Sequence, residues 1–298
     1  MRVSPSIHRI IDQSLRGLRT LALLGLTLGL AGCSLIETAY NQAPQLLYWW
    51  LDRQVDLTEA QRGPVKEALQ DLSRWHRRQE LPQWQALAQR LSSQMGPEIS
   101  PAQACAAQAE GLESLRRFAR QSALPLGQLA SSLSPAQLSY LQQRLAKNDV
   151  DWRKEWLDGS AEKRLQNRVK RGLERSEDLY GRLSRAQVAH LEQLVGQSAY
   201  QAEIAWAERQ RRQQDLLQTL ERARGQSPEF AQKEVAAWIE RALASPVPEH
   251  RTHAEQSTLG VCRAIAGLHN ETTPEQREHA AGRLREYARA FGRLAQGS

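Results

Sequence analysis

The sequence predicts an all-α protein, an irregular multi-helix bundle that follows a signal peptide and a short lipid-anchored tether. Ala, Leu, Gln, Arg and Glu, which are good helix formers, dominate its 298 residues, and β-branched residues are sparse. Apolar positions recur at helical spacing, as in Leu165, Val169 and Leu173. These observations predict helices near residues 45–54, 59–79, 81–95, 101–123, 135–157, 160–181, 185–223, 228–243, 251–268 and 274–295.

The first 33 residues have the parts of a bacterial lipoprotein leader. Four arginines precede an apolar run of twelve residues, Leu21 to Gly32, which is shorter than the roughly 20 residues of a membrane-spanning helix. Such a run is typical of a signal peptide. It ends in LAGC, which resembles a lipobox, whose cysteine receives a diacylglyceryl group. We expect removal of residues 1–32 and lipidation of Cys33; the alternative is an ordinary signal peptide in which Cys33 is incidental.

Ser34 follows the lipidated position, where an aspartate would favour the inner membrane. By resemblance to bacterial lipoprotein sorting, this serine favours the periplasmic face of the outer membrane of a Gram-negative bacterium, held by acyl groups such as palmitate. A single acyl chain binds membranes only marginally, whereas several anchor stably. We therefore expect a tether over residues 33–44 and a single helical domain over residues 45–298.

The charge of the chain does not indicate a nucleic-acid partner. The leader carries four of the 40 basic residues and one of the 33 acidic residues, so much of the formal charge of +7 belongs to it. The remainder carries only about +4, which is not the footprint of a nucleic-acid-binding surface.

Two cysteines, Cys105 and Cys262, remain beside the anchor. An oxidising envelope compartment permits a disulfide between them, and an even pair with no leftover thiol suits one. The bond would tie an early helix to a late one and make the chain one closed unit. Two separate buried thiols are the alternative.

The helix starts share one short pattern. Thr58, Ser134, Ser184 and Thr273 are each followed by glutamine three residues later, and Ser100 begins a fifth variant. This spacing forms a capping box, in which the hydroxyl satisfies a free N–H of the first turn and the glutamine bonds back to the cap residue. The intervals between the boxes are irregular, which favours a bundle of unequal helices over a solenoid with a fixed period.

Three aromatic residues stand together in the sequence LYWWLDR, which begins at Leu47. In a helix, Leu47, Trp50 and Leu51 share one face, and we expect that face to dock onto the bundle as core. Tyr48 and Trp49 point elsewhere and are candidates for a membrane-facing, interfacial position, as amphipathic rings often are.

Four arginines line one side of the helix expected over 160–181. Arg164, Arg168, Arg171 and Arg175 are spaced by four, three and four residues, which puts them within roughly 60° of one face. Such a row of guanidinium groups could bind phosphates or carboxylates, and anionic lipid headgroups are the anions at hand. The alternative is a solvated face paired with neighbouring glutamates.

The LAGC sequence, then AYNQAPQLLYWWLDRQVDLTEAQ, and then a basic helix leading into LYGRLSRAQ resemble a family of proteobacterial outer-membrane lipoproteins of unknown function. This resemblance implies an all-helical envelope lipoprotein and supplies no activity. A weaker likeness connects the repeated L-T-x-x-Q pattern with small periplasmic helical chaperones and stress sensors. Helix capping alone also explains that pattern.

Catalytic signatures are not found in the sequence. It has neither a nucleophile elbow nor a glycine-rich phosphate loop, and His250 with His253 makes only two of the three or four ligands of a zinc site. We expect no cofactor, no metal and no catalysis. The leading hypothesis is a binding or chaperone-like envelope protein whose client is an envelope protein, an unfolded segment or a lipid. The alternatives are a structural, self-associating lipoprotein and, less favoured, a cell-envelope hydrolase of unrecognised type.

Overall fold

The computed structural model describes residues 36–297, which fall into two units divided at Pro44. The described part of the first unit, residues 36–43, is helical. The leader over residues 1–32 and the lipidation of Cys33 lie outside the described residues and stay predictions. All that follows concerns the second unit, Pro44–Ser298.

The described residues of this unit form helices and no strands, which confirms the predicted all-α class. Residues 44–55 form its first helical segment. The helices that follow are α2 (Glu59–Gln79), α3 (Leu81–Ser93), α4 (Pro101–Gln121), α5 (Ala123–Ser132), α6 (Pro135–Trp156), α7 (Ala161–Tyr180), α8 (Arg185–Gly196), α9 (Ala202–Ala223), α10 (Pro228–Leu243), α11 (Pro248–Asn270) and α12 (Pro274–Gln296).

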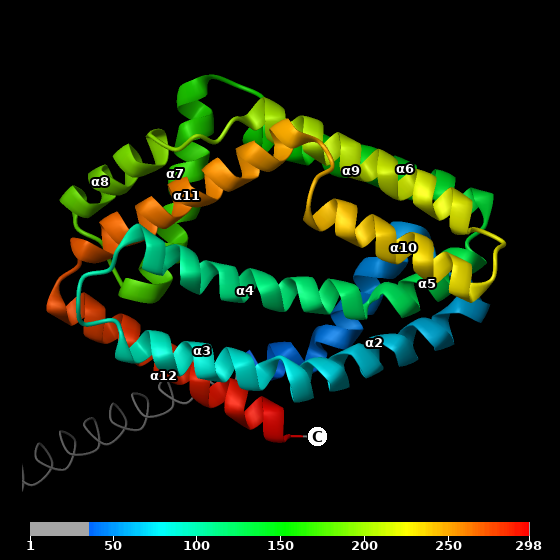
Figure 1. Ribbon diagram of the computed structural model, residues 1–298, viewed down its shortest axis with the longest axis horizontal. Helices are drawn as coiled ribbons and strands as arrows, with labels where there is room; N and C mark the ends of the chain where they lie inside the picture. The colour runs from blue at the N-terminus through cyan, green and yellow to red at the C-terminus, as the bar shows by residue number, and fades with distance from the viewer. Residues whose placement is uncertain (1–35, 298) are drawn as a thin grey trace, which may run out of the picture. The chain divides into compact units, whose positions relative to one another are not determined.

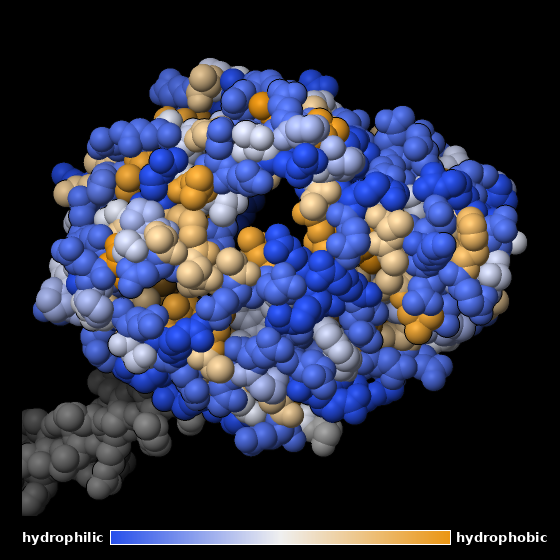
Figure 2. Space-filling model, in the orientation of Figure 1, coloured by the Kyte–Doolittle hydropathy of each residue, from blue (hydrophilic) through white to orange (hydrophobic). Residues whose placement is uncertain are grey.

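In the view of Figure 1, α4 crosses the middle, with α2, α3 and α12 on one side and α6 and α9 on the other. Helices α7 and α8 lie at one end and α5 and α10 at the other. Contacts pair α3 with α12, α5 with α10, and α11 with both α4 and α8. Figure 2 shows that the same face is hollowed near its centre.

The interior contains two main hydrophobic cores. The larger joins residues 44–55 with α2, α5, α6, α9 and α10, and the smaller joins Met95, which follows α3, with α7, α8, α11 and α12. A third, small cluster lies around Cys262 between α4 and α11. The chain contributes to the second core at Met95, from α7 to α8 and from α11 to α12, and it returns to the first core between these stretches. Neither core therefore consists of a continuous segment.

The expectation of one helix over 185–223 is wrong, because residues 197–201 separate α8 from α9. Helix α11 packs closely on this connection: a Cβ at Gly260 would lie 3.0 Å from the Cβ of Ser198. The ring nitrogen Nε2 of His253 accepts a hydrogen bond from the backbone N–H of Gln201 at 2.9 Å. Tertiary contacts therefore hold the break, although the local sequence permits a helix.

Helix α5 was not expected from the sequence, and it contains Pro125 and Gly127. The proline lies in the first turn, where a missing N–H costs nothing. The glycine allows close packing, because a Cβ at Gly127 would come 2.5 Å from the Cα of Gln232 in α10. Packing on α10 thus accounts for a helix that composition alone disfavours.

A disulfide joins Cys105 in α4 to Cys262 in α11, with an S–S distance of 2.02 Å. This is the first of the two alternatives that the sequence left open. The bond closes a loop with a sequence separation of 157 residues. It lies in the small cluster around Cys262 and ties α4 to α11, which pack against each other.

The five predicted capping boxes are present, at the starts of α2, α4, α6, α8 and α12. Four of them also pair with each other across the fold. The side-chain amide of Gln61 donates to the carbonyl of Ser132 at 3.0 Å, and that of Gln137 donates to the carbonyl of Asp56 at 2.9 Å. The two amides bond each other as well, with Gln137 Nε2 donating to Gln61 Oε1 at 2.8 Å.

The same arrangement recurs at the starts of α8 and α12. The amide of Gln187 donates to the carbonyl of Glu271 at 2.9 Å, and that of Gln276 donates to the carbonyl of Arg182 at 2.9 Å. Gln187 Nε2 also donates to Gln276 Oε1 at 2.7 Å. In both places each glutamine reaches the carbonyl two residues before its partner's N-cap. We call each pair of helix starts a glutamine clasp.

Replacement of Gln137 by alanine is expected to lower the free energy of unfolding by about 1–3 kcal/mol, because a helix cap is lost and the carbonyl of Asp56 loses its donor. Gln103 provides a matched control, since it occupies the same capping-box position in α4 but is exposed and bonds only within its own box. Q103A should cost less, about 0.5–1 kcal/mol. Urea denaturation measures both. Equal losses in the two variants would contradict the clasp.

Removal of the disulfide in a C105A/C262A variant should lower the free energy of unfolding by roughly 2–5 kcal/mol, because the open chain regains the conformational freedom of a long loop. Denaturant titration of the variant and of the reduced wild-type protein checks this. The two should agree, and a variant as stable as the oxidised protein would refute the expectation.

Candidate functional site

An apolar groove with a volume of about 400 Å³ lies on the larger core. Residues from the segment 44–55, from α2, from the end of α4 and from α5 line it. Its volume falls within the roughly 300–1,000 Å³ that is usual for ligand sites, which are mostly apolar with a few polar groups. The groove is therefore a candidate binding site.

The walls of the groove follow from helical spacing. In α2, Val65, Leu69 and Leu72 stand one turn apart and turn the same face to the groove. In α5, Leu126 and Leu129 do the same. The sequence reading missed this site because α5 was not expected, and one wall of the groove is that helix.

The groove also presents hydrogen-bonding groups. Pro64 lies within α2 and has no N–H, so the carbonyl of Ala60 lacks the donor that a helix normally supplies four residues later. Both residues line the groove, as does the exposed Gln128. A ligand that combines apolar groups with amide groups would match this lining.

The expectations for three residues of the aromatic segment are wrong. Leu47 and Trp50, expected in the core, are 43% and 60% exposed, and Tyr48, expected to face a membrane, is 7% exposed and packs in the larger core. The face that contains Leu47, Trp50 and Leu51 does turn toward the domain. It meets the open groove there, so these side chains line a cavity wall and the ring of Tyr48 fills the core. Trp49 is 57% exposed, which agrees with the expectation of an outward ring.

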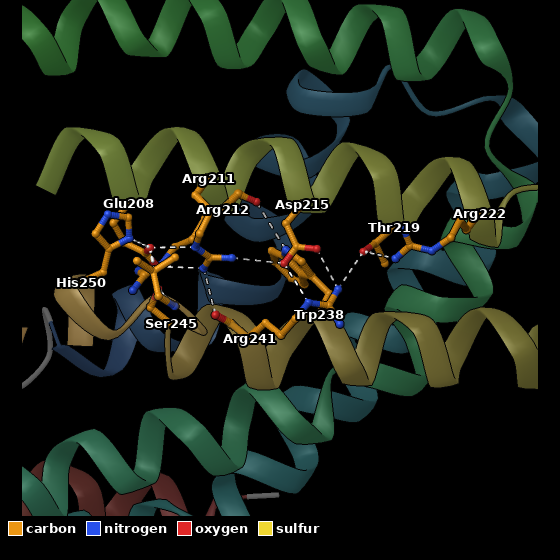
Figure 3. A network of polar contacts seen from close by, with 11 residues as sticks. Glu208, Arg211, Arg212, Asp215, Thr219, Arg222, Trp238, Arg241, Ser245 and His250 are labelled. Atoms are coloured by element: carbon orange, nitrogen blue, oxygen red, sulfur yellow. Dashed lines mark hydrogen bonds and ion pairs between the residues drawn. The ribbon is translucent and has the colours of Figure 1, made fainter. Parts of the chain in front are cut away.

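A network of charged and polar side chains connects α9 with α10 and with the start of α11 (Figure 3). Its centre is Glu208 in α9, which is 8% exposed. Its carboxylate accepts hydrogen bonds from Arg211 at 2.7 and 2.8 Å, from Arg212 at 2.6 Å and from the hydroxyl of Ser245 at 2.8 Å. The Nδ1 of His250 lies 2.6 Å away. The network therefore ties α9 to the start of α11.

The network continues along α9 toward α10. Arg241 binds Asp215 through two hydrogen bonds of 2.9 and 2.8 Å, and Arg211 donates to the backbone carbonyl of Arg241 at 3.0 Å. Hydrogen bonds from Arg241 hold the pKa of Asp215 below its ordinary value, against the opposing effect of burial. These contacts lie on facing sides of α9 and α10 in Figure 3.

Burial by itself would raise the pKa of Glu208, but the hydrogen bonds from Arg211, Ser245, Arg212 and His250 outweigh it and lower the pKa to about 2. A carboxylate with so low a pKa is a weak base near neutral pH. The arrangement is suited to holding helices together.

Three of the four arginines in the predicted anion-binding row are engaged within the protein. Arg164 pairs with Glu203 at 2.7 Å, and Arg171 pairs with Glu155 at 2.6 Å. Arg168 donates to the carbonyl of Val195 and lies over the ring of Tyr200.

Burial lowers the pKa of Arg168, although the nearby Tyr200 opposes the shift. Arg175 is exposed and has no ion pair within the described part of the chain. These contacts favour a structural use of the row over an open anion site.

Residues 36–297 contain no cluster of three or more His, Cys, Asp or Glu side chains placed to hold a metal ion. Over that same range, the helices are too short or too polar for any of them to cross a bilayer.

The low pKa of Glu208 predicts a specific acid sensitivity. Because the folded-state pKa lies below the ordinary value of 4.5, its ionised form stabilises the fold above pH 4.5, and this contribution is lost as the pH falls toward 2. E208Q should lose on the order of 3 kcal/mol at pH 7. Its stability should then fall less steeply than that of the wild type between pH 4.5 and 2.

Circular dichroism during denaturation at several pH values measures this difference. E249Q changes an exposed glutamate in the first turn of α11 and is the matched control, which should follow the wild type. Parallel pH profiles for E208Q and the wild type would refute the assignment.

Comparison with known proteins gives one match. The sequence model of DUF6279, a family of unknown function, matches residues 53–242, from the end of the first helical segment through most of α10. Searches of curated proteins and of solved structures found no match. The matched range contains four of the five capping boxes and most of the groove. Since it covers more than half of the sequence, the chain belongs to the family of unknown function DUF6279.

Proposed function

We propose that this protein is a lipid-anchored envelope protein that binds apolar stretches of unfolded polypeptides, in a chaperone-like role without catalysis. The lipobox-like sequence before Cys33 supports the anchor, and Ser34 supports the outer membrane as its location. The observation that carries the binding role is the groove between the segment 44–55, α2 and α5.

The lining of the groove favours a polypeptide client. Leucine and valine side chains of α2 and α5 supply apolar walls that could accommodate client side chains. The carbonyl of Ala60 and the amide of Gln128 at the same site can bond backbone N–H and C=O groups of an extended segment. Pairing buried polar groups of a client in this way avoids the cost of leaving them unsatisfied.

The position of the groove suits reversible capture. Trp50 and Leu47 are 60% and 43% exposed at its edge, so the site is open to solvent. Core residues such as Val65 and Leu129 hold its floor in the larger core. A rigid floor with an open edge lets a client enter without unfolding the domain.

Filling the groove should abolish client binding. The full-length protein is expected to suppress light scattering from an aggregating, reduced model client at stoichiometric ratios. A68F places a ring in the groove from α2 and should raise the protein concentration needed for half-protection about tenfold, which corresponds to about 1.4 kcal/mol of binding free energy.

A106F is the matched control, because Ala106 is an exposed alanine of α4 that does not line the groove. It should protect the client as well as the wild type. Equal protection by A68F, or no protection by the wild-type protein, would overturn the proposal. Thermal unfolding of both variants verifies that they are folded.

A further inference from the structure

Four large apolar side chains gather on the outside of the segment 44–55. Leu46, Leu47, Trp49 and Trp50 are 52%, 43%, 57% and 60% exposed. Twelve large hydrophobic residues are exposed in the described part of the chain, and four of them fall within these five consecutive positions. Apolar residues scattered singly over a surface need no explanation, but a contiguous patch marks an interaction site. We call these four residues the apolar strip.

The strip has a defined orientation. At 100° per residue, Leu46, Trp49 and Arg53 follow one another along one face of the helix, and Trp50 lies beside them. Arg53 is exposed and makes no ion pair with another described residue. Along this face, the apolar side chains of Leu46, Trp49 and Trp50 are followed by the single cation of Arg53.

The opposite side of the helix is fixed to the domain. Tyr48 and Val55 are 7% and 5% exposed and belong to the larger core. Gln54 is also buried, and its Oε1 lies 3.4 Å from the side-chain nitrogen of Asn148 in α6. The strip is thus held outward by packing on its reverse side.

We propose that the apolar strip docks onto a phospholipid bilayer, with Leu46, Trp49 and Trp50 in the interfacial layer and Arg53 at the headgroup phosphates. Tryptophan is enriched at membrane interfaces, where its ring is apolar and its N–H stays hydrated. Apolar residues beside a basic one are the composition of helices that lie in the plane of the interface.

The distance along the chain supports the same partner. Leu46 is thirteen residues after Cys33, so even a fully extended chain places the strip within roughly 45 Å of a lipid anchor at that cysteine. In the sequence, the strip lies in the first part of the segment 44–55, which is the part closer to Cys33 along the chain. A lipid surface is therefore the extended apolar partner within its reach.

Docking would also orient the groove. Leu47 and Trp50 belong to both the strip and the groove lining, whereas Leu46 and Trp49 lie outside the groove. A domain that rests on the strip holds the edge of its groove at the membrane surface. Leu46 and Trp49 nevertheless belong to the strip alone, and Ala68 lines the groove without belonging to the strip, so docking and client binding can be removed separately.

Fluorescence quenching tests the docking. The full-length protein is reconstituted into phosphatidylcholine vesicles whose acyl chains are brominated near the headgroup. Bromine quenches only tryptophans that enter the bilayer. We expect quenching of the wild type, and a loss of about half of the quenched signal in W49F, since Trp49 and Trp50 both enter the interface. W156F changes a half-buried tryptophan at the end of α6 and should retain the quenching.

The double variant L46S/W49S separates docking from client binding. Neither residue lines the groove, so the variant should still protect a client in solution while its bilayer quenching falls at least about twofold. A68F should lose client protection and keep the bilayer quenching of the wild type. Equal quenching of W49F and the wild type, or no quenching of either, would overturn the docking. A wild-type dimer that L46S/W49S converts to a monomer in light scattering would assign the strip to a second copy and overturn it as well.

Discussion

The two glutamine clasps are the constraint on which the rest of this fold depends. The first turn of a helix leaves backbone N–H groups that have no partner within the helix itself. Here the starts of α2 and α6 meet in one core and those of α8 and α12 in the other. Each clasp satisfies the helix starts and the incoming backbone together, because one amide group serves both. The clasps also set the distance between the paired helix starts.

The clasps explain why the intervals between the boxes are irregular in a protein with repeated motifs. The boxes bond to each other in pairs, and the two boxes of a pair can be separated by any number of residues. Other helices are formed by the chain between them. The chain crosses between the cores at α7, α9 and α11, and the bond from Cys105 to Cys262 ties α4 to α11. Within Pro44–Ser298, these crossings join the two cores into one compact unit.

Local signals predicted much of the fold, and contacts between distant residues decided the rest. Capping boxes have a fixed spacing of residue types, so the helix starts could be read directly from the sequence. The pairing of one capping box with another depends on the tertiary structure, so the spacing of residues in the sequence does not predict it. Helix α5 escaped prediction because its partner, α10, permits Gly127 and Pro125 in a helix. Tyr48 is buried and Trp50 is exposed, the opposite of what was expected for each ring. Periodicity identifies which residues share a helix face, but it does not tell whether a core or a cavity lies opposite that face.

Gln61 connects the scaffold with the proposed function, because it belongs both to the first clasp and to the lining of the groove. Its amide also bonds the backbone carbonyl of Ser132, which lines the groove at the end of α5. The clasp therefore fixes the relative position of two groove walls, α2 and α5. The apolar strip shares Leu47 and Trp50 with the third wall. A buried clasp fixes the inner walls of the groove, and the outer edge of the groove continues into the exposed strip. The groove is therefore rigid on its inner side and open on its outer side. That asymmetry supports the proposals that clients bind in the groove and that the strip docks on a membrane.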